Sequence, residues 1–419
     1  MNRFGPLWHP QTNLSTLDHD RLVITGGEGA WLTTEDGQRL LDLPASLWHA
    51  NIGHGRVRVA EAAAAQMRTL ETYHLFGGHA HRPAMQLAER LVAMLPMSEP
   101  SVFLTSGGSD SIDTACKLAR RYWQQVGRPS KKLILSRTGG YHGLHGYGTS
   151  IAGLDFNREG YGSESLIPET ARIPANDLAE ATAIIERIGA ENIAAMVVEP
   201  VIGTGGVIPP AEGYLEGLRA LARTNEIVFV ADEVITGFGR LGRWFGSERW
   251  GLEPDMIIMA KGMTSGYLPL GAVGIAGWLS EPFAEPGAPI FRHGLTYSGH
   301  ATACAVAEAN LDIIEEEGLV GVVAGLEPIL AEAVAPLADL PQVVEVRSIG
   351  LMAGIQLTPK TNAAEVIRGC RADGVLTRLL ADNTLHICPP FVTTADELRL
   401  AIKTLGAQIA RVEVEEDPR

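Results

Sequence analysis

Cysteine is scarce in this chain of 419 residues, and the four cysteines are far apart: Cys116, Cys304, Cys370 and Cys388. This spacing gives neither a disulfide framework nor a zinc knuckle. Basic residues are also outnumbered by acidic residues: the chain has 34 Lys and Arg but 49 Asp and Glu. The net charge of −15 argues against nucleic acid and anionic membranes as partners. No apolar run approaches the ~20 residues of a membrane span, and no signal-peptide core begins the chain. We therefore expect a soluble, cytoplasmic protein.

Glycine, in contrast, is abundant, and its 47 residues suggest many turns between strands and helices. The hydrophobic share of 46% is enough for a sizeable core. A chain of this length is expected to form two domains, or one large domain with a smaller one beside it.

Between residues 100 and 300, apolar runs typical of strands alternate with helical patterns. Near-continuous apolar strands separated by helices predict an α/β fold, with a mainly parallel sheet covered on both faces. In such sheets the active site forms at the carboxyl ends of the strands. The predicted strands are 102–104, 133–135, 194–198, 227–231, 256–259 and 272–276.

The two flanking regions have a different pattern, which predicts a small α+β domain that the N-terminal strands join. The predicted strands are 22–25, 30–33, 39–42, 342–347, 350–357 and two short ones before a final helix from 395. The other predicted helices are 57–72, 83–95, 301–317, 320–337 and 362–373. The expected domain limits are 1–55 and 311–419 for the small domain and 56–310 for the large domain.

A lysine and an aspartate each stand at the end of an apolar run. Lys261 follows 256–259, where burial favours the neutral amine that attacks a carbonyl and holds it as a Schiff base. Taken alone, this stretch also fits a surface lysine at a strand end. Asp232 follows 227–231, and a carboxylate carried that deep needs a cationic partner. A protonated pyridine nitrogen would serve as that partner.

Four further motifs suggest a binding site for a ligand with a phosphate group and a flat ring. The glycine-containing segment 105–117 opens a helix, whose N-terminus can bind phosphate or can simply be capped by Ser or Asp. Tyr141 could lie on a planar ring or be an ordinary buried tyrosine. Glu199 precedes a glycine-rich loop, and the polar segment 293–300 offers a second phosphate contact. Together with the lysine and the aspartate, these motifs describe pyridoxal phosphate.

At this point the sequence resembles the class III (ω-type) pyridoxal-phosphate aminotransferases of fold type I. The resemblance covers nearly the whole chain, and the spacing of segments 231–234 and 261–262 is its most specific part. It implies a large domain with a mainly parallel seven-stranded sheet, and a small α+β domain built from both ends of the chain. It also implies pyridoxal 5′-phosphate as cofactor and a homodimer with active sites at the subunit interface.

The resemblance assigns a role to single residues. Lys261 would bond the cofactor and move the substrate proton, and Asp232 would pair with the pyridine N–H. Tyr141 and Val234 would pack on the two faces of the ring. Arg378 would pair with a substrate carboxylate, a task that suits a planar guanidinium. The implied cofactor-binding residues are Gly108, Ser109, Tyr141, His142, Glu199, Asp232, Val234, Lys261 and Thr296, the last from the neighbouring subunit. The implied substrate-binding residues are Trp48, Tyr141 and Arg378, and Phe76 suggests a further aromatic wall.

Two segments depart from the family pattern. Residues 107–112 read Gly-Gly-Ser-Asp-Ser-Ile where the family usually has Ser-Gly-Ser-Glu-Ala-Asn, although the Gly-Ser pair of the phosphate cup is kept. The interval between Arg378 and Cys388 is one residue longer than in the family pattern. Arg378 could therefore also be a solvated loop arginine that has no role in substrate binding.

The function predicted from this resemblance is ping-pong transfer of an amino group from a primary amine or an ω- or β-amino acid to an oxo acid, pyruvate being the expected acceptor. An aminomutase or a decarboxylase on the same fold would share the cofactor motifs. The pattern Gly-x-Gly-x-x-Gly at 237–242 leaves a nicotinamide-dependent oxidoreductase as a remote alternative, and a non-catalytic relative is a third. The close histidine pairs 79/81 and 142/145 lack nearby acidic or cysteine ligands, so no metal site is predicted.

Overall fold

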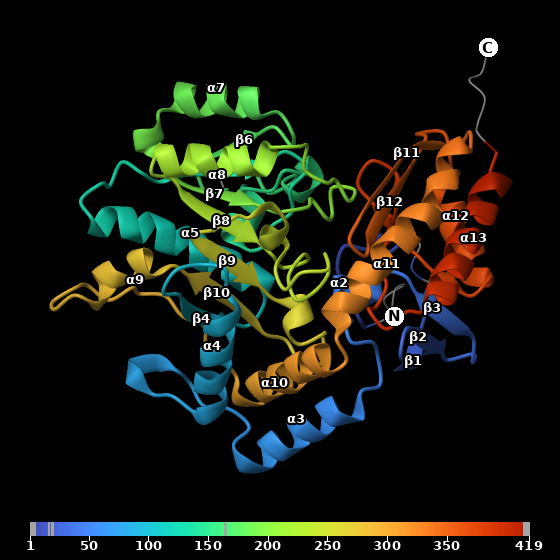
Figure 1. Ribbon diagram of the computed structural model, residues 1–419, viewed down its shortest axis with the longest axis horizontal. Coiled ribbons are helices and arrows are strands. Elements are labelled where there is room, and N and C mark those ends of the chain that lie inside the picture. Colours follow the sequence, from blue (N-terminus) through green and yellow to red (C-terminus); the bar gives the residue numbers. More distant parts are fainter. Residues whose placement is uncertain (1–5, 16, 18–20, 163–165, 414–419) are drawn as a thin grey trace.

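The computed structural model describes residues 6–15, 17, 21–162 and 166–413. Its large lobe is built around a seven-stranded sheet with the strand order β4-β10-β9-β8-β7-β5-β6 (Figure 1). Strand β10 is antiparallel to both of its neighbours, while β9, β8, β7, β5 and β6 run parallel. The strand bounds are β4 Ser101–Thr105, β5 Leu133–Arg137, β6 Thr170–Ile173, β7 Ile193–Val198, β8 Val228–Asp232, β9 Met256–Met259 and β10 Gly271–Ile275. The mainly parallel sheet of the predicted fold is thus confirmed.

The central strands are buried on both faces, as their continuous apolar sequence predicts. Every residue of β7, β8 and β9 is buried. Strand β6 was not predicted, because its sequence Thr-Ala-Arg-Ile lacks a continuous apolar run and lies at the sheet edge.

Helices cover the sheet and extend the large lobe. Helix α5 packs against β10, β9 and β7 through its apolar face, and α10 packs against α3 and α4. The helices of this lobe are α3 Val57–Thr69, α4 Arg82–Met94, α5 Gly108–Gln125, α6 Gly146–Ser150, α7 Leu178–Ile188, α8 Tyr214–Thr224, α9 Gly277–Ala284 and α10 Ala301–Glu316.

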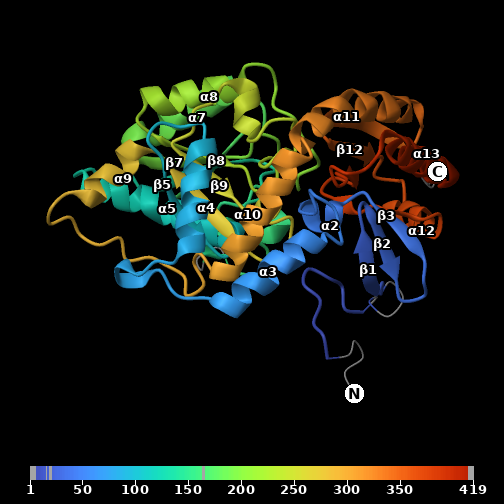
Figure 2. The ribbon, with the colours of Figure 1, turned by 60° about the horizontal axis from the view of Figure 1, so that its bottom comes forward.

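The small lobe contains two four-stranded sheets, ordered β1-β2-β3-β13 and β11-β12-β15-β14. The short strand β13 pairs in parallel with β3, which joins the C-terminal part of the chain to the N-terminal strands. Figure 2 shows β1, β2 and β3 on the same side of the large lobe as α11, α12 and α13. The bounds are β1 Ile24–Glu28, β2 Trp31–Thr34, β3 Arg39–Asp42, β11 Val343–Ile349, β12 Met352–Leu357, β13 Val375–Leu376, β14 Leu379–Leu380 and β15 Thr384–Ile387, with helices α2 Ala45–Trp48, α11 Leu319–Val334, α12 Ala363–Ala372 and α13 Ala395–Arg411.

One helical stretch corrects the expectation that no apolar run has membrane-spanning length. Among the described residues, Leu319–Asp339 is 21 residues long and apolar enough, by length and composition alone, to cross a membrane. In this structure it packs against α13 and β11. Its Glu327 carboxylate pairs with Arg249 at 2.9 Å and accepts a hydrogen bond from the backbone N–H of Gly350.

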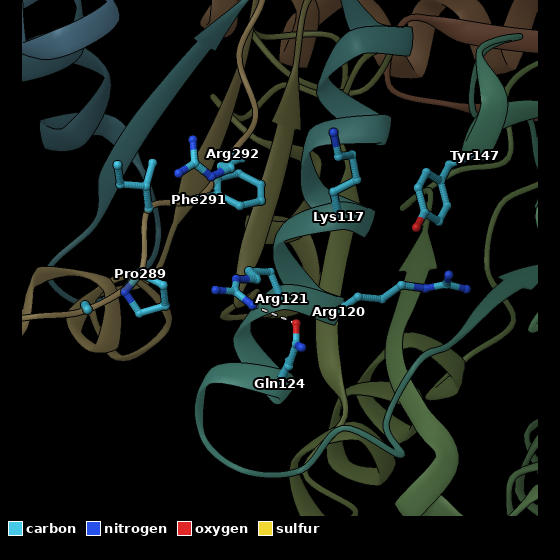
Figure 3. Close-up of a pocket in the computed structure, with 10 residues that line it drawn as sticks. Lys117, Arg120, Arg121, Gln124, Tyr147, Pro289, Phe291 and Arg292 are labelled. Carbon is cyan, nitrogen blue, oxygen red and sulfur yellow. Dashed lines mark hydrogen bonds between the residues drawn. The ribbon is translucent and has the colours of Figure 1, made fainter.

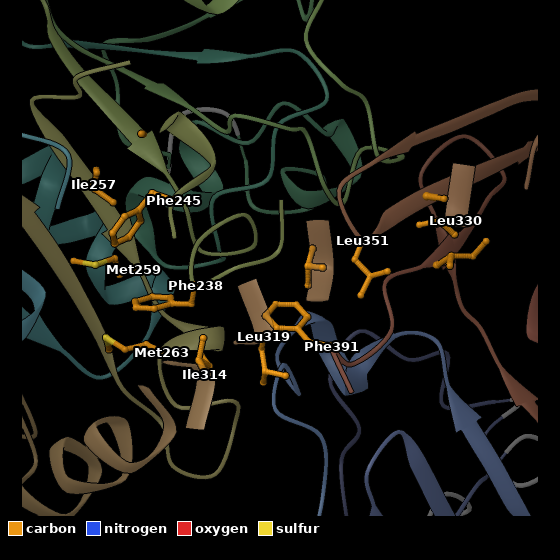
Figure 4. Close-up of a cluster of buried hydrophobic side chains, with 14 of the residues drawn as sticks. Phe238, Phe245, Ile257, Met259, Met263, Ile314, Leu319, Leu330, Leu351 and Phe391 are labelled. Carbon is orange, nitrogen blue, oxygen red and sulfur yellow. The ribbon is translucent and has the colours of Figure 1, made fainter. Parts of the chain in front are cut away.

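One of the hydrophobic clusters of the protein connects the two lobes. Figure 4 shows part of it, from Met259 and Phe245 near the large sheet to Leu330 and Phe391 in the small lobe. The expected domain boundary at 310/311 falls inside the continuous helix α10. The division of the chain into domains therefore stays a prediction.

Candidate active site

Three parallel strands end at one edge of the large sheet, and each delivers a polar side chain there. Glu199 follows β7, Asp232 is the last residue of β8, and Lys261 stands two positions after β9. Because β7, β8 and β9 are adjacent and parallel, their carboxyl ends meet at the same edge. The spacing of the apolar runs in the sequence predicted this arrangement for Asp232 and Lys261.

A cavity of about 580 Å³ lies at this edge. Its lining contains ten of the eleven site residues expected from the sequence: Trp48, Gly108, Ser109, Tyr141, His142, Glu199, Asp232, Val234, Lys261 and Arg378. The eleventh, Thr296, is exposed on the segment before α10 and does not line the cavity of its own chain. Phe76 does not line it either, because it lies in a separate cavity with Phe291 and His293.

Lys261 presents an amine with weakened proton affinity. Burial lowers the pKa of Lys261 to about 8, against the opposing effect of the negative charges of Asp232 and Glu199. Its backbone is in the left-handed region, with φ +42°, at the start of the short 3₁₀ turn Lys261–Met263. Non-glycine residues in this region carry strain that tends to occur at functional sites.

Asp232 is held by two hydrogen bonds. Its Oδ2 lies 2.8 Å from Nδ1 of His142, and its Oδ1 accepts the backbone N–H of Val234 at 3.1 Å. Burial lowers the pKa of His142, but the hydrogen bond and charge of Asp232 outweigh burial and raise that pKa above its ordinary value. The contact with Asp232 therefore favours the protonated form of His142. The other ring nitrogen of His142, Nε2, is buried and has no hydrogen-bond partner among the described residues.

Glu199 fixes two segments of backbone around the cavity. One carboxylate oxygen accepts the N–H of Tyr141 and the other accepts the N–H of Gly203, both at 2.9 Å. Burial raises the pKa of Glu199, although the charge of His142 and these hydrogen bonds oppose the effect. Glu199 thus anchors the loop that carries Tyr141.

The N-terminus of α5 forms the opposite wall. Gly108 and Ser109 begin this helix of 18 residues, where backbone N–H groups lack helical partners and attract anions. Gly143, with φ +82°, passes so close to Ser109 that a Cβ atom there would lie 2.3 Å from the Ser109 hydroxyl. A Cβ on Gly108 would meet Val234 at 3.1 Å. Glycine at these positions keeps the helix N-terminus open to a ligand.

Trp48 and Arg378 line the side of the cavity that faces the small lobe. Trp48 has a left-handed backbone, as do Ala45 and Ser46 in the same short segment. The Asp42 carboxylate accepts the N–H of Ser46 at 2.7 Å and so holds this segment. Burial lowers the pKa of Arg378, but a guanidinium stays charged under all ordinary conditions.

Sequence reasoning missed several lining residues: Pro10, Gln11, Leu47, Ile112, Leu144, Thr204, Ile235 and Ala260. Most of them are sequence neighbours of motif residues, so extending each motif by a few residues would have identified them. Ile112, for example, lies one helical turn after Ser109 and reaches the same side of α5. Pro10 and Gln11 are brought in by the path of the N-terminal segment, and no local pattern marks them.

A second large cavity, of about 730 Å³, lies on the outer side of α5 (Figure 3). Its cationic side chains are Lys117, Arg120, Arg121 and Arg292, with Tyr147 and Phe291 as aromatic walls. It shares no lining residue with the cavity at Lys261. The chemistry expected from the strand ends therefore belongs to the cavity at Lys261.

Two other sequence patterns do not build a site. Segment 237–242 forms turns after β8 and opens no α-helix, which differs from the arrangement that binds a dinucleotide. Within the part of the chain that the structure describes, no group of three His, Cys, Asp or Glu side chains is placed to hold a metal ion.

A lysine amine, a buried carboxylate and a helix N-terminus around one cavity define an enzyme that works on amines and carbonyl compounds with a phosphorylated cofactor. Comparison with known families matches residues 15–409 to the aminotransferase class-III family. An omega-aminotransferase from Caulobacter vibrioides is 36% identical over 98% of this chain and 99% of its own length. A putrescine–pyruvate aminotransferase from Pseudomonas aeruginosa is 37% identical over 93% of this chain and 91% of its own length.

Solved structures agree with this match. The amine transaminase of an uncultivated Pseudomonas species, in its PLP-bound form, has a TM-score of 0.92 and 36% identity, covering 97% of this chain and 99% of that one. The chain belongs to the class III aminotransferases, and it is a PLP-dependent transaminase of fold type I.

The residues of the cavity fit pyridoxal phosphate. The α5 N-terminus offers free N–H groups for a phosphate, and Asp232 offers a buried carboxylate for a pyridinium nitrogen. Lys261 lies in the same cavity with an amine that burial makes easier to deprotonate. Tyr141 and Val234 also line it and supply flat or apolar surfaces for a ring.

Proposed function

We propose that the enzyme transfers the amino group of a primary amine or an ω- or β-amino acid to an oxo acid, with pyruvate as the acceptor. The observation that carries this proposal is the shared cavity of Lys261 and Arg378. An amine and a guanidinium in one cavity suit both a carbonyl to be attacked and a carboxylate to be paired. The putrescine–pyruvate relative supports pyruvate as acceptor.

Pyridoxal phosphate, when bound, supplies the electron sink for breaking a C–H bond next to the amino group. The chain supplies the proton transfer and the charges. Lys261 would take the proton from the substrate carbon and return it to the aldehyde carbon of the cofactor within the same half-reaction, and its pKa of about 8 suits this role near neutral pH. Asp232 keeps the pyridine nitrogen protonated by its negative charge.

The remaining residues orient the reacting groups. Gly108 and Ser109 bind the phosphate at the α5 N-terminus, and Tyr141 and Val234 hold the ring from its two faces. His142 fixes the Asp232 carboxylate through the bond of 2.8 Å. On the substrate side, Trp48 and Tyr141 bound the space for the amine, and Arg378 pairs with a carboxylate. In this proposal Glu199 positions Tyr141 from behind, through its backbone N–H.

We also propose that the enzyme works as a cytoplasmic homodimer with shared active sites. Thr296 supports this, because it is exposed and does not line the cavity of its own chain, while the sequence resemblance assigns it to a phosphate contact. A second copy of the chain would bring this hydroxyl to the partner's phosphate. The net charge of −15 supports a soluble location.

The test is an amino-transfer assay on the purified holoenzyme with a panel of amines against pyruvate and 2-oxoglutarate. We expect alanine to form with pyruvate, in step with loss of the amine. Lys261→Ala should lower the activity at least ~10³-fold, because it deletes the proton-transfer group. The matched control is Lys132→Ala, at an exposed lysine.

Two results would contradict the proposal. Full activity of Lys261→Ala would exclude the proposed proton transfer. Release of CO₂, or migration of the amino group within one substrate without alanine formation, would instead identify a decarboxylase or an aminomutase.

A further inference from the structure

Arg378 has a cross-strand neighbour that the proposed mechanism does not use. Strands β14 and β15 pair Leu379 with Leu385 and Leu380 with Thr384, so the next step of this antiparallel register places Arg378 opposite His386. The backbone N–H of His386 donates to the carbonyl of Arg378 at 3.0 Å, as this register requires. Opposed residues on antiparallel strands project from the same face, with Cβ atoms about 5 Å apart.

His386 is buried without a hydrogen bond to its side chain. It is fully buried, and both of its ring nitrogens lack a partner among the described residues. Burial and the positive charges of Arg378, Arg240 and Lys261 lower the pKa of His386 well below its ordinary value, so the ring is neutral. A neutral imidazole has one acceptor nitrogen. Buried polar groups without a partner are uncommon and call for an explanation.

The ring of His386 also touches the substrate side of the cavity. It packs on Trp48 with ring centroids 3.7 Å apart and an interplanar angle of 39°. Trp48 and Arg378 both line the cavity, and His386 packs against Trp48 without lining the cavity itself. The ring of His386 does not line the cavity, but its strand position is directly opposite Arg378.

Arg378 and His386 are complementary. Arg378 lines the cavity, its guanidinium has five N–H donors, and no hydrogen bond from them is found among the described residues. The neighbouring imidazole has an acceptor without a donor. A change of rotamer in the long arginine side chain would join the two groups without moving either strand.

Ping-pong transfer gives a reason for the Arg378 side chain to occupy two alternative positions. This step of the inference rests on the function proposed above. A carboxylate-bearing oxo acid and an amine without a carboxylate must use the same cavity in turn. A guanidinium left unpaired beside an apolar amine destabilises that complex. An acceptor outside the substrate space removes this cost.

We propose that His386 is a positioning residue whose ring accepts a hydrogen bond from Arg378 when the substrate carries no carboxylate. With a carboxylate present, Arg378 leaves the ring and pairs with the substrate. His386 thereby raises kcat/KM for amines without a carboxylate, and it leaves kcat/KM for carboxylate-bearing substrates almost unchanged.

The experiment compares propylamine with β-alanine, which differ only by a methyl group in place of the carboxylate. For each amine, kcat/KM is measured against pyruvate on the holoenzyme, because in a ping-pong cycle this ratio reports the amine half-reaction alone. His386→Phe keeps a ring on Trp48 and removes the acceptor. His386→Gln keeps a neutral acceptor.

His386→Phe should lower kcat/KM for propylamine about 10-fold or more, as expected for one hydrogen bond to a charged group. The values for β-alanine and for pyruvate should stay within about threefold. His386→Gln should restore most of the propylamine activity. In an Arg378→Met background, His386→Phe should have no further effect on propylamine, because the group that it positions is gone.

Equal losses on propylamine and β-alanine after His386→Phe would show a purely structural role and overturn the proposal. Persistence of the propylamine effect in the Arg378→Met background would also overturn it, as would a wild-type enzyme that accepts β-alanine but not propylamine. A wild-type enzyme that transfers amino groups from neither amine contradicts the proposed function instead.

Discussion

The carboxylate of Asp232 and the imidazole of His142 form a buried pair, with Oδ2 and Nδ1 2.8 Å apart at the end of β8. In the function proposed above, this pair would place a fixed negative charge beside the pyridine nitrogen of the cofactor. Since the second carboxylate oxygen is held by the N–H of Val234, the side chain has little freedom to turn away. The geometry is therefore fixed before any ligand binds.

Replacing this charge should slow the reaction without unfolding the protein. Asp232→Asn keeps the size of the side chain but cannot stabilise a protonated pyridine nitrogen. We expect the single-turnover rate of the amine half-reaction to fall at least ~100-fold, a typical cost of removing one electrostatic contact from a transition state. Asp396→Asn, at an exposed carboxylate on the first turn of α13, is the matched control. A wild-type rate in Asp232→Asn would refute the role of the charge.

The lowered pKa of Lys261 predicts how stability depends on pH in the cofactor-free protein. The folded pKa is about 8 against 10.5 for an ordinary lysine, so the unfolded chain binds more protons between these values. By linkage, this lysine makes the folded state more stable as pH rises through that window, by about 3 kcal/mol in total.

Urea unfolding at about pH 7 and about pH 10.5 tests this relation. The wild-type protein should gain stability relative to Lys261→Met over this interval, because methionine does not titrate. The exposed Lys132→Met should follow the wild-type curve. Parallel curves for wild type and Lys261→Met would mean that the amine titrates normally in the folded protein.

Thr296 offers a test of active sites shared between two subunits. Thr296→Ala should weaken binding of pyridoxal phosphate about 10- to 100-fold, the usual range for one hydrogen bond to a charged group. Equilibrium dialysis of the cofactor measures this change. Thr69→Ala, at the end of α3, is the control.

Subunit mixing then shows which chain supplies the hydroxyl. In a dimer of one Lys261→Ala chain and one Thr296→Ala chain, a shared arrangement leaves one site with both wild-type residues. At a concentration of pyridoxal phosphate too low to load the Thr296→Ala enzyme, mixed dimers should therefore regain up to about half of the wild-type activity per dimer. If the hydroxyl acts within its own chain, no intact site forms and no activity returns.

Arg240 ties together three segments that are distant in sequence. Its guanidinium donates to the side chain of Asn51 at 2.9 Å and to the carbonyls of Leu351 and Pro389, and it lies over the ring of Phe391. Arg240→Met should leave these buried acceptors unpaired and lower the free energy of unfolding by about 3 kcal/mol or more.

Chemical denaturation of the two proteins measures this loss. Arg399→Met is the control, since its exposed pair with Asp396 should contribute less than about 1 kcal/mol. Equal effects of the two substitutions would show that the buried network does not stabilise the fold.

The sequence predicted those parts of the fold and site that have a strong local signal. The apolar runs before Asp232 and Lys261 predicted both the strands and the positions of their carboxyl ends, because a fully buried parallel strand must be continuously apolar. Strand β6 escaped prediction, since an edge strand of four residues needs no such run.

Other features arise only from tertiary packing. The contact of Trp48 with His386 joins residues 338 positions apart, counted as 386 − 48, and neither segment shows a pattern that predicts it. Gln11 reaches the cavity through the path of the N-terminal segment. The helix over 320–337 was predicted, but the apolar character of the whole stretch Leu319–Asp339 was missed, because isolated glutamates and prolines interrupt its apolar pattern.

The core that runs unbroken from Met259 to Phe391 has a consequence for how substrates enter. Hinged opening of one lobe against the other would expose this apolar surface to water, which is costly over any large area. Entry and release should therefore depend on small local motions at the mouth of the cavity, such as rotation of the Arg378 side chain.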